Sequence, residues 1–460
     1  MTSSSEKPDA VGNETGDRIF FTVFVAGLAG LSFIAGALII LSETPPYRYL
    51  RDAWTGGKAL WEQQTKYTSV ERLDFWAPQR NDKTGVTRHD SARVQPGLTL
   101  YSSGDGPHAV LVDMEGNIVH EWRAPFSAFY DEETSPIKNP QRDEFMHWHT
   151  AKMLPDGDIV VQYTAAGDTP YGYGLARLDR ESNVVWGYLG EAHHDFSFDE
   201  AGFVYALTHE FRFNEYKDRD PLRTPRLDDF AVQLSPEGKE LKRVSILDAL
   251  LESSYAHYLD FVPWFSADDV LHTNTIEVID AARAAVFPHG KEGDVLLSFR
   301  DMGVIAVLDM DAEKIVWATR GPWFGQHDPD ILENGEILLF DNQGQMADPD
   351  AGQSRVIQID PITNAITWEY RGTADDPFDS DIRADQERLP NGNTLMTESS
   401  GGRLLEVTAD GDVVWEYYNP IRRDDPEKPG TRLIPVVSQA ERISDDRMRL
   451  FVPDNTGENP

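Results

Sequence analysis

The sequence contains no cysteine among its 460 residues. Thiol nucleophiles, disulfide bonds, iron–sulfur clusters and zinc sites built from thiolates are therefore excluded. Basic residues are also scarce, since 42 lysines and arginines stand against 78 aspartates and glutamates, and the formal net charge is -36. A surface of this sign repels phosphate backbones and anionic lipid headgroups. Nucleic acid is therefore not expected as a partner.

The strongest regional signal lies at the start of the chain, where residues 19–41 carry no charged side chain. An apolar run of this length can cross about 30 Å of hydrocarbon as a single helix. No small-residue cleavage site follows the run, which favours an uncleaved transmembrane anchor over a secretory signal. Lysines and arginines flank the run on both sides and do not orient the helix in a membrane.

Composition divides the chain into four segments. Residues 1–18 are rich in serine and acidic residues and are expected to be disordered, and residues 19–41 form the transmembrane helix. Residues 42–96 contain two successive prolines and a helix-like stretch at 50–67, and they are predicted to form a stalk. In residues 97–455, short apolar runs alternate with Asp-Gly, Asn-Gly and Glu-Gly turns, a pattern typical of β-hairpins.

Two kinds of hairpin recur in alternation along the chain. The first kind lies at residues 108–122, 173–188, 230–246, 303–321, 354–372 and 402–420. The second kind lies at residues 149–163, 194–207, 272–300, 327–340, 386–398 and 440–452. Two hairpins make one four-stranded sheet, and about six repeats of such a unit predict a propeller rather than a sandwich. We therefore expect an all-β, six-bladed β-propeller preceded by one N-terminal transmembrane helix and a short stalk.

Four of the second hairpins begin with a histidine at the same place in the repeat: His149, His194, His272 and His327. The first strand of each propeller sheet lines the central channel, so these side chains are expected to converge at one end of the axis. A repeat also retains histidines for structural hydrogen bonds, and clustered imidazoles bind zinc or copper. His193 lacks the shared register, whereas His209 ends a strand where it would form a second layer around the cluster.

The position of Arg300 favours an anion over a metal ion as the ligand of the histidine cluster. Arg300 ends the strand that pairs with the one following His272. An arginine beside imidazoles disfavours a bound cation and holds an oxyanion through two hydrogen bonds. Sulfate, phosphate or carboxylate is therefore the favoured ligand, and no metal is expected in the site. The alternative is a structural ion pair between Arg300 and Asp301 or a carboxylate of another sheet.

Several segments resemble the bacterial arylsulfate sulfotransferases that use no nucleotide sulfate donor. Residues 272–278 and 296–300 are similar to the family's His-x-Asn-Ser strand and its Ser-Arg strand end. Residues 325–344 are similar to its Gln-His hairpin, which ends in Phe-Asp-Asn. Residues 353–370 are similar to its Ser-Arg hairpin, which ends in Trp-Glu-Tyr. Residues 193–207 resemble an earlier His-His-Asp hairpin of the family. The resemblance spans about residues 97–455 and supports the propeller fold.

The resemblance implies a chemistry and a set of roles. It implies transfer of a sulfuryl group from an aryl sulfate to a phenol through a sulfohistidine intermediate. The catalytic residues that it implies are His327 as the nucleophile, His194 and His272 as further active-site imidazoles, and Arg300 as the sulfate-binding arginine. The substrate-binding residues that follow from the matched segments are Asn274, Asn342, Arg355 and His149, of which His149 is also an alternative to His194.

The chain departs from the family in three respects. The family's Asp-Asn-Gly-Asp-Gly-Arg segment appears as DNQGQMADPD at residues 341–350, the cysteine pair and insertion before the nucleophile are missing, and a membrane helix and stalk replace the N-terminal β-domain. These changes bear on the choice of acceptor and on subunit contacts, and a homo-oligomer is compatible with the sequence. The resemblance implies no cofactor, aryl sulfates and phenols as partners, and a propeller held in the periplasm by an inner-membrane helix.

Other functions remain open at this stage. A catalytically silent, membrane-anchored propeller that acts as a binding or assembly module would keep the same sheet pattern, because one fold hosts many functions. A quinoprotein-like dehydrogenase shares the tryptophan-bearing repeats, although nothing in the site favours it. A sulfatase differs only in using water as the acceptor.

Overall fold

The computed structural model of the chain describes residues 14–42, 44, 47, 49, 75–168, 171–216, 222, 224–263, 266, 268–344 and 349–451. The chain divides into two compact units, residues 1–71 and residues 72–460. The helix-like stretch predicted at 50–67 and residues 1–13 of the predicted disordered tail lie outside the described residues.

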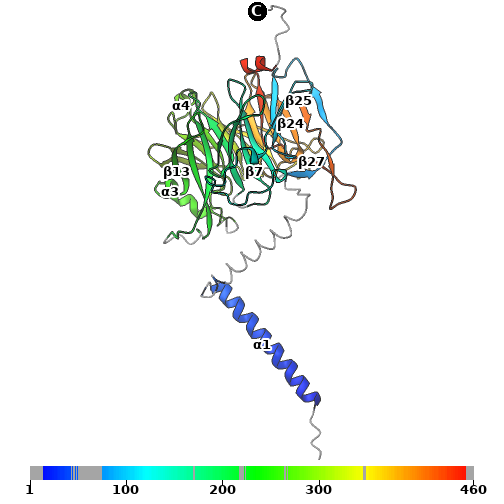
Figure 1. The fold of residues 1–460 in the computed structure, drawn as a ribbon, viewed down its shortest axis with the longest axis vertical. Helices are drawn as coiled ribbons and strands as arrows, with labels where there is room; N and C mark the ends of the chain where they lie inside the picture. The colour runs from blue at the N-terminus through cyan, green and yellow to red at the C-terminus, as the bar shows by residue number, and fades with distance from the viewer. Residues whose placement is uncertain are drawn as a thin grey trace, which may run out of the picture. The chain divides into compact units, whose positions relative to one another are not determined.

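The first unit contains the long helix α1 (Glu14–Ser42), which appears in blue in Figure 1. Its segment Arg18–Ser42 has the length and composition of a membrane span and includes the predicted run 19–41. Apolar side chains such as Phe33 and Leu41 are exposed to 77% and 82%. A helix satisfies its own backbone hydrogen bonds, as a lipid environment requires. The helix therefore fits a single-pass membrane anchor, and its first turn begins inside the segment predicted to be disordered.

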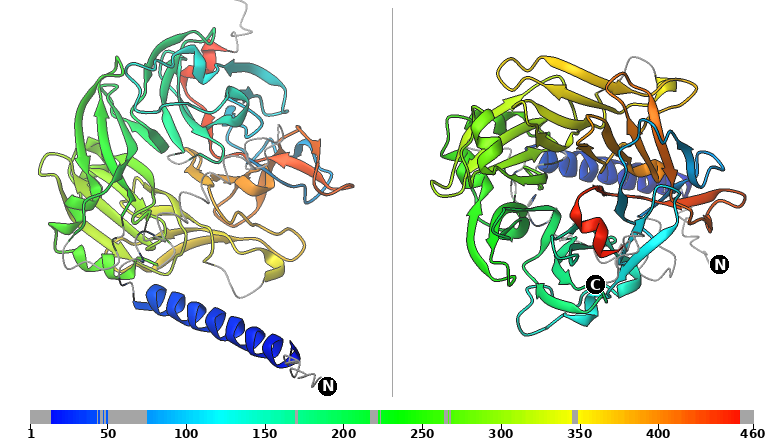
Figure 2. Two further views of the ribbon diagram at one scale, coloured as in Figure 1. Left: turned by 60° about the horizontal axis from the view of Figure 1, so that its bottom comes forward. Right: turned by 90° about the horizontal axis from the view of Figure 1, so that it is seen from above.

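The second unit is all-β. In its described residues, six antiparallel sheets contain four strands each, and one of them gains a fifth strand. Figure 2 shows the sheets arranged around a common centre in the order of the chain, which is the arrangement of a β-propeller. Two short helices, α3 (Ile246–Leu251) and α4 (Ala281–Val286), lie in connections between the strands.

In hydrogen-bonding order, the strands of the first three sheets are β28 (Ala440–Ile443), β3 (Leu98–Ser102), β4 (His108–Val112) and β5 (Ile118–Arg123); β6 (Met146–Met153), β7 (Ile159–Ala165), β8 (Gly172–Leu178) and β9 (Val184–Tyr188); and β10 (Ala192–Phe198), β11 (Val204–Arg212), β12 (Arg226–Leu234) and β13 (Glu240–Ser245). Those of the other three are β14 (Thr273–Val278), β15 (Val295–Phe299), β16 (Val304–Asp309) and β17 (Lys314–Arg320); β18 (His327–Ile331), β19 (Ile337–Asp341), β20 (Arg355–Ile359) and β21 (Ile366–Arg371); and β22 (Asp385–Arg388), β23 (Thr394–Glu398), β24 (Arg403–Val407), β25 (Val413–Tyr418) and β2 (Gly85–His89).

The middle strands are buried on both faces because each sheet is packed between two others. In β15, Leu297 packs in one core cluster with Leu207 of the preceding sheet. The next residue back, Leu296, packs in a different cluster with Leu339 of the following sheet. Successive side chains of a strand point to opposite faces, so a continuous apolar run fills two cores at once. Burial of each such leucine contributes roughly 1.5–3 kcal/mol.

The two ends of the propeller domain are joined through their strands. The predicted hairpin at 440–452 is wrong, because β28 pairs with β3 from the start of the domain and a 3-10 helix, Asp446–Leu450, follows it. Two strands also lie in the segment predicted as a stalk: β2 pairs with β25, and β1 (Trp76–Pro78) pairs with β27 (Arg432–Pro435). A third strand of that small sheet is β26 (Arg423–Asp424). These pairings join residues far apart in the chain, which local patterns do not reveal.

The first strands of the six sheets are linked by side chains that bond to the backbone of the next strand. Backbone N–H groups donate to carboxylates in five such links: Met153 to Glu441 (3.1 Å), Ile276 to Asp195 (3.1 Å), Ile331 to Glu277 (3.2 Å), Gln386 to Asp328 (3.0 Å) and Arg442 to Glu387 (2.9 Å). The remaining link, from β6 to β10, comes from the Lys152 ammonium, which donates to the Phe196 carbonyl at 2.7 Å.

A buried ion pair ties β28 to β24. The Arg442 guanidinium lies 3.1 Å from the Glu406 carboxylate, and neither side chain has any exposed surface. Arg442 also donates to the Thr99 hydroxyl at 3.1 Å and lies over the Trp415 ring. Removal of one member of such a pair leaves the other charge buried without compensation.

We expect the substitution Arg442→Met to lower the free energy of unfolding by about 3–5 kcal/mol. Urea denaturation of the detergent-solubilised chain measures this loss. Arg449→Met is the matched control, because the Arg449–Asp446 pair is exposed and its removal is expected to change nothing measurable. Equal stability of the two variants would contradict the structural role of the pair.

Candidate active site

The candidate residues lie where the first strands of four sheets begin. Each of these strands has an irregularity in register at this end: between Trp148 and Ala151, Ala192 and Phe196, Thr273 and Thr275, and His327 and Asp330. His194, His272 and Asp328 have positive φ angles of 52°, 44° and 53°. Such a conformation costs roughly 1–3 kcal/mol and turns the side chains away from the regular alternation of a strand. The bulges thus bring His194 and His272 together at one end of the strands, whereas Asp328 faces β22, where it accepts a hydrogen bond from the Gln386 backbone.

His327 has one ring nitrogen fixed and one available. Its Nδ1 lies 2.8 Å from the Asn342 Oδ1 and 3.0 Å from the Gly325 carbonyl oxygen. Both partners only accept hydrogen bonds, so Nδ1 carries the proton and donates it. The Nε2 atom makes no hydrogen bond to any described residue. A neutral His327 therefore presents an unprotonated nitrogen, which is a nucleophile.

The orientation of Asn342 is fixed by its own partners. The side chain is fully buried, and its Nδ2 donates to the carbonyl oxygens of Ser380 and Arg383, each at 2.8 Å. These two acceptors require the amide nitrogen on their side, which turns Oδ1 toward His327. Asn342 is predicted to bind substrate, but the structure places it against the Nδ1 side of the His327 ring. There it holds the imidazole in the Nδ1-protonated tautomer.

A chain of contacts joins Asp269, His272 and Arg300. The His272 Nδ1 lies 2.6 Å from the Asp269 carboxylate, and the Arg300 Nη1 donates to the His272 Nε2 at 2.8 Å. Arg300 also lies 3.5 Å from Asp301, the alternative partner that the sequence suggested, and its side chain keeps 26% of its surface exposed. The guanidinium is therefore held at the site and still accessible to an anion.

His149 and His194 complete a group of neighbouring imidazole rings. The ring centroids lie 5.4 Å apart between His149 and His194 and 5.2 Å apart between His194 and His272. The His149 Nδ1 donates to the His194 carbonyl oxygen at 3.1 Å. The His194 Nδ1 lies 2.8 Å from the Nδ1 of His193 and 3.3 Å from the Tyr171 hydroxyl. The structure thus brings together His149, His194 and His272 as the register predicted.

Burial and the Asp269 carboxylate give these histidines different pKa values. Burial lowers the pKa of His327 well below 6.5, with Arg300 adding to the effect, and it lowers the pKa of His149 to about 3. The pKa of His194 is lowered in the same way. Burial also lowers the pKa of His272, but the Asp269 carboxylate outweighs it and leaves that pKa above 6.5. At neutral pH the site therefore contains an uncharged His327 beside the most basic imidazole of the group.

The two remaining candidates, Asn274 and Arg355, form their hydrogen bonds with other groups of the protein. The Asn274 Nδ2 donates to the carbonyl oxygen of Gln326 at 2.8 Å, which supports the backbone just before His327. Arg355 donates to Asp341 at 2.8 Å and to Glu369 at 3.2 Å, and it also bonds to the Pro322 carbonyl. Both side chains are buried, so these contacts give them structural positions beside the site.

Sequence patterns did not reveal all of the partners. Asp269 and Tyr171 reach the site from connections outside the aligned hairpins, and no repeat position marks them. His193 lies outside the shared register of the repeats, although it directly precedes His194 in the chain and contacts it in space. The adjacent pair of histidines was the one signal that indicated this contact.

A cavity among the described residues lies toward the other end of the first strands. It has a volume of about 820 Å³, and the residues of those strands that line it include Lys152, Glu277, Asp330, Gln386 and Glu441. None of the four predicted histidines lines it. The imidazole group is therefore separate from this strongly charged cavity.

The fold and the site define a class: a propeller-type all-β protein with a buried group of histidines and the partly exposed Arg300 beside them. A family model described as arylsulfotransferase (ASST) matches residues 149–420, which is more than half of the chain. The chain therefore belongs to the arylsulfotransferase family, as the motifs indicated. The match includes His149, His194, His272, Arg300 and His327.

Solved structures show distant similarity to the chain, and no curated protein matches it. A protein of unknown function from Bacteroides caccae has 13% identity and a TM-score of 0.43, with 76% of this chain and 100% of that chain covered. The WD40 β-propeller domain of Doa1 has 10% identity and a TM-score of 0.39, with 80% and 96% covered. Virginiamycin B lyase from Staphylococcus aureus has 11% identity and a TM-score of 0.34, with 59% and 69% covered.

We expect Asn342→Ala to release the tautomer of His327, because the Oδ1 acceptor at Nδ1 is lost. Nitrogen-15 NMR of histidine-labelled, detergent-solubilised protein measures the tautomer. The wild type should show one Nδ1-protonated form of His327, and the variant should show a mixture. Asn419→Ala removes another fully buried asparagine, whose Nδ2 donates to the Ser103 hydroxyl at 2.9 Å, and it should leave the His327 signal unchanged. An unaltered signal in Asn342→Ala would show that other contacts hold the ring.

Proposed function

We propose that the protein transfers a sulfuryl group from an aryl sulfate to a phenol in two steps, with His327 as the covalent nucleophile. The observation that carries this proposal is the Asn342 contact, which holds the His327 proton on Nδ1 and leaves Nε2 without a hydrogen bond to any described residue. Membership of the arylsulfotransferase family supports the same chemistry.

In the first step, the His327 Nε2 attacks sulfur and the bond from sulfur to the aryl oxygen breaks. The ring then carries a positive charge that includes its Nδ1 proton, which Asn342 Oδ1 and the Gly325 carbonyl stabilise. Negative charge remains on the sulfuryl oxygens, as in phosphoryl transfer, and the Arg300 guanidinium binds them. The departing phenolate takes a proton from His272. In the second step the acceptor phenol returns a proton to His272, its oxygen attacks sulfur, and the bond to Nε2 breaks.

The opposite pKa shifts of His327 and His272 suit this division of roles. A nucleophile must be unprotonated and an acid protonated at the same pH, and environments that drive two pKa values apart make both states available together. Arg300 currently donates to the His272 Nε2, which keeps that nitrogen unprotonated. When Arg300 turns to a bound sulfate, the His272 Nε2 loses this donor and can take up a proton. The Asp269 carboxylate stabilises the resulting imidazolium.

We also propose the finer architecture and placement. The six sheets are the blades of a closed propeller, supported by the links that run through all six first strands and by the pairing of β28 with β3. The predicted limits of the domain, 97–455, then extend to include β1 and β2. The propeller lies outside the cytoplasm, and α1 tethers it to the inner membrane. Aryl sulfates and phenols are the substrates, and His149 borders their binding site.

The decisive experiment measures nitrophenol release from nitrophenyl sulfate by the detergent-solubilised full chain, with and without phenol. We expect release that depends on phenol, is abolished in His327→Ala and is unchanged in His257→Ala, since His257 is exposed and its ring contacts the Ser254 carbonyl and Tyr258 rather than the site. Arg300→Lys should lower kcat by about 10²–10³-fold, because a preorganised charge contact at the reacting group is lost. Phenol-independent release would identify a sulfatase, and no release across a panel of aryl sulfates would favour the binding module.

The pH profile of the first step gives a separate prediction. His327 has a lowered pKa, so it stays neutral as the pH falls through 6.5, and the rate should not decline there. His272 has a raised pKa, so it loses its proton only above pH 6.5, and the rate should fall on that side. Single-turnover release of nitrophenol in the absence of acceptor measures both limbs. An acid limb with a midpoint near 6.5 would contradict the assignment of His327.

A further inference from the structure

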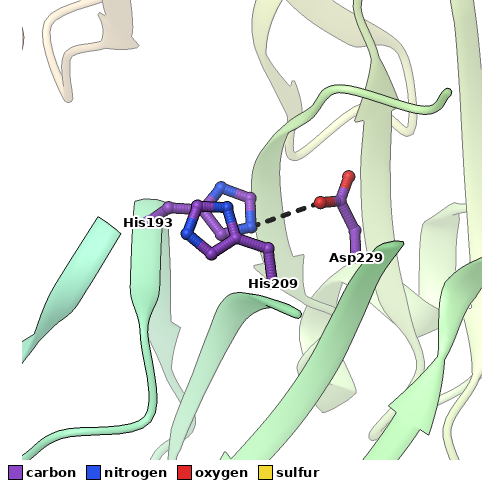
Figure 3. Close-up of side chains that lie close together, drawn as sticks. All are labelled: His193, His209 and Asp229. Carbon is purple, nitrogen blue, oxygen red and sulfur yellow. Dashed lines mark ion pairs between the residues drawn. The ribbon is translucent and has the colours of Figure 1, made fainter. Parts of the chain in front are cut away.

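A second group of ionisable side chains lies next to the candidate active site. His193, His209 and Asp229 come from the adjacent strands β10, β11 and β12, and Figure 3 shows the two imidazoles and the carboxylate close together. His209 and Asp229 are directly paired across β11 and β12. One ligand atom from each residue lies within 4.8 Å of the others. The proposed sulfuryl chemistry uses none of the three.

The group is buried and its polar atoms are poorly satisfied. The exposed fractions are 1% for His193, 1% for His209 and 2% for Asp229. The His193 Nε2 and both ring nitrogens of His209 have no hydrogen bond of normal geometry to any described residue, although backbone groups of Thr208 and Gly172 lie near the two rings. Buried polar atoms without partners are rare in folded proteins, because each loses the hydrogen bonds that water supplied. Direct stacking of the two rings, with centroids 4.4 Å apart and planes at 14°, leaves these nitrogens unpaired.

Few contacts compensate the charge of the Asp229 carboxylate. The Asp229 Oδ2 accepts one hydrogen bond, from the Thr273 backbone at 2.8 Å. The sole ion-pair contact of this carboxylate among the described residues is with His193, whose Nε2 lies 3.5 Å from Oδ1. A buried carboxylate is stabilised by a cation, and two imidazole nitrogens supply the other donors that a metal requires.

The geometry points to a divalent transition-metal site formed by His193 Nε2, His209 and Asp229, with zinc as the fitting ion. Two imidazoles and one carboxylate form a donor set that zinc takes with a fourth position for water. Calcium and magnesium prefer oxygen donors alone, so a site with two nitrogens disfavours them. Coordination at about 2.0–2.2 Å requires the donor atoms, now within 4.8 Å of one another, to move closer together by rotation of the stacked rings.

The proposed metal acts on the candidate active site through one hydrogen bond. The Nδ1 atoms of His193 and His194 lie 2.8 Å apart, so one of them donates to the other. A metal on the His193 Nε2 leaves the His193 proton on Nδ1, which makes His193 the donor. The proton of a neutral His194 then lies on its Nε2. His193 is therefore a positioning residue, and the metal selects the tautomer that His194 presents to the other imidazoles.

Metal binding is tested on the detergent-solubilised full chain without a histidine tag, after removal of bound metal with a chelator. Titration with Zn²⁺ by calorimetry, followed by elemental analysis after gel filtration, should give one Zn²⁺ per chain. Asp229→Asn and His209→Gln should abolish this binding. His289→Gln is the control, because His289 stacks on Trp317 away from the group, and it should bind zinc as the wild type does.

Further measurements locate the ion and guard against misfolding. His327→Gln should retain Zn²⁺, whereas its loss there together with retention in Asp229→Asn would overturn the proposal in favour of the active-site imidazoles. Because the ligand variants risk misfolding, Zn²⁺ is also added to the metal-free wild type, where it should raise Tm and shift the nitrogen-15 signals of His193, His194 and His209. Substoichiometric binding, or no shift of these signals, would overturn the proposal whatever the enzymatic activity.

Discussion

The free edge of the first strand is the constraint on which much of this structure depends. Backbone N–H groups along that edge face the centre of the domain and have no neighbouring strand to bond with. Side chains of the adjacent sheet supply acceptors, as Glu277 does for Ile331 and Glu387 does for Arg442. This requirement explains why carboxylates lie deep inside the domain, where burial raises the pKa of Glu277 to about 7 and that of Glu387 to about 8. It also makes the large cavity at that end strongly charged.

At the opposite end of the same strands, bulges interrupt the regular edge. The left-handed residues His194 and His272 store strain there, and the surrounding hydrogen bonds hold them, including the Thr150 hydroxyl that donates to the His194 carbonyl at 2.7 Å. The bulges direct imidazoles rather than carboxylates toward one another. One set of strands therefore supports two chemically different ends, an acidic cavity and a histidine site.

Burial gives the histidine site its chemical character within a very acidic protein. The net charge of -36 repels anions at long range, so an anionic substrate depends on local contacts. Desolvation keeps His327 neutral, whereas Asp269 makes His272 more basic. The two imidazoles therefore have different pKa values because their surroundings differ. Arg300 contacts His272 inside the protein and is also partly exposed at the surface.

The sequence by itself determined the repeating hairpins, the apolar span and the register of His149, His194, His272 and His327, because strand period, turn residues and apolar length are local properties. The tertiary structure alone decided that β28 joins β3, that β1 and β2 belong to the propeller domain, and that Asp269 contacts His272. It also decided that Asn342 fixes a tautomer and that Arg355 bonds to Asp341 and Glu369. These outcomes depend on which distant segments meet and which atoms are buried between them, and a hydrogen bond between such segments leaves no periodic mark in the sequence.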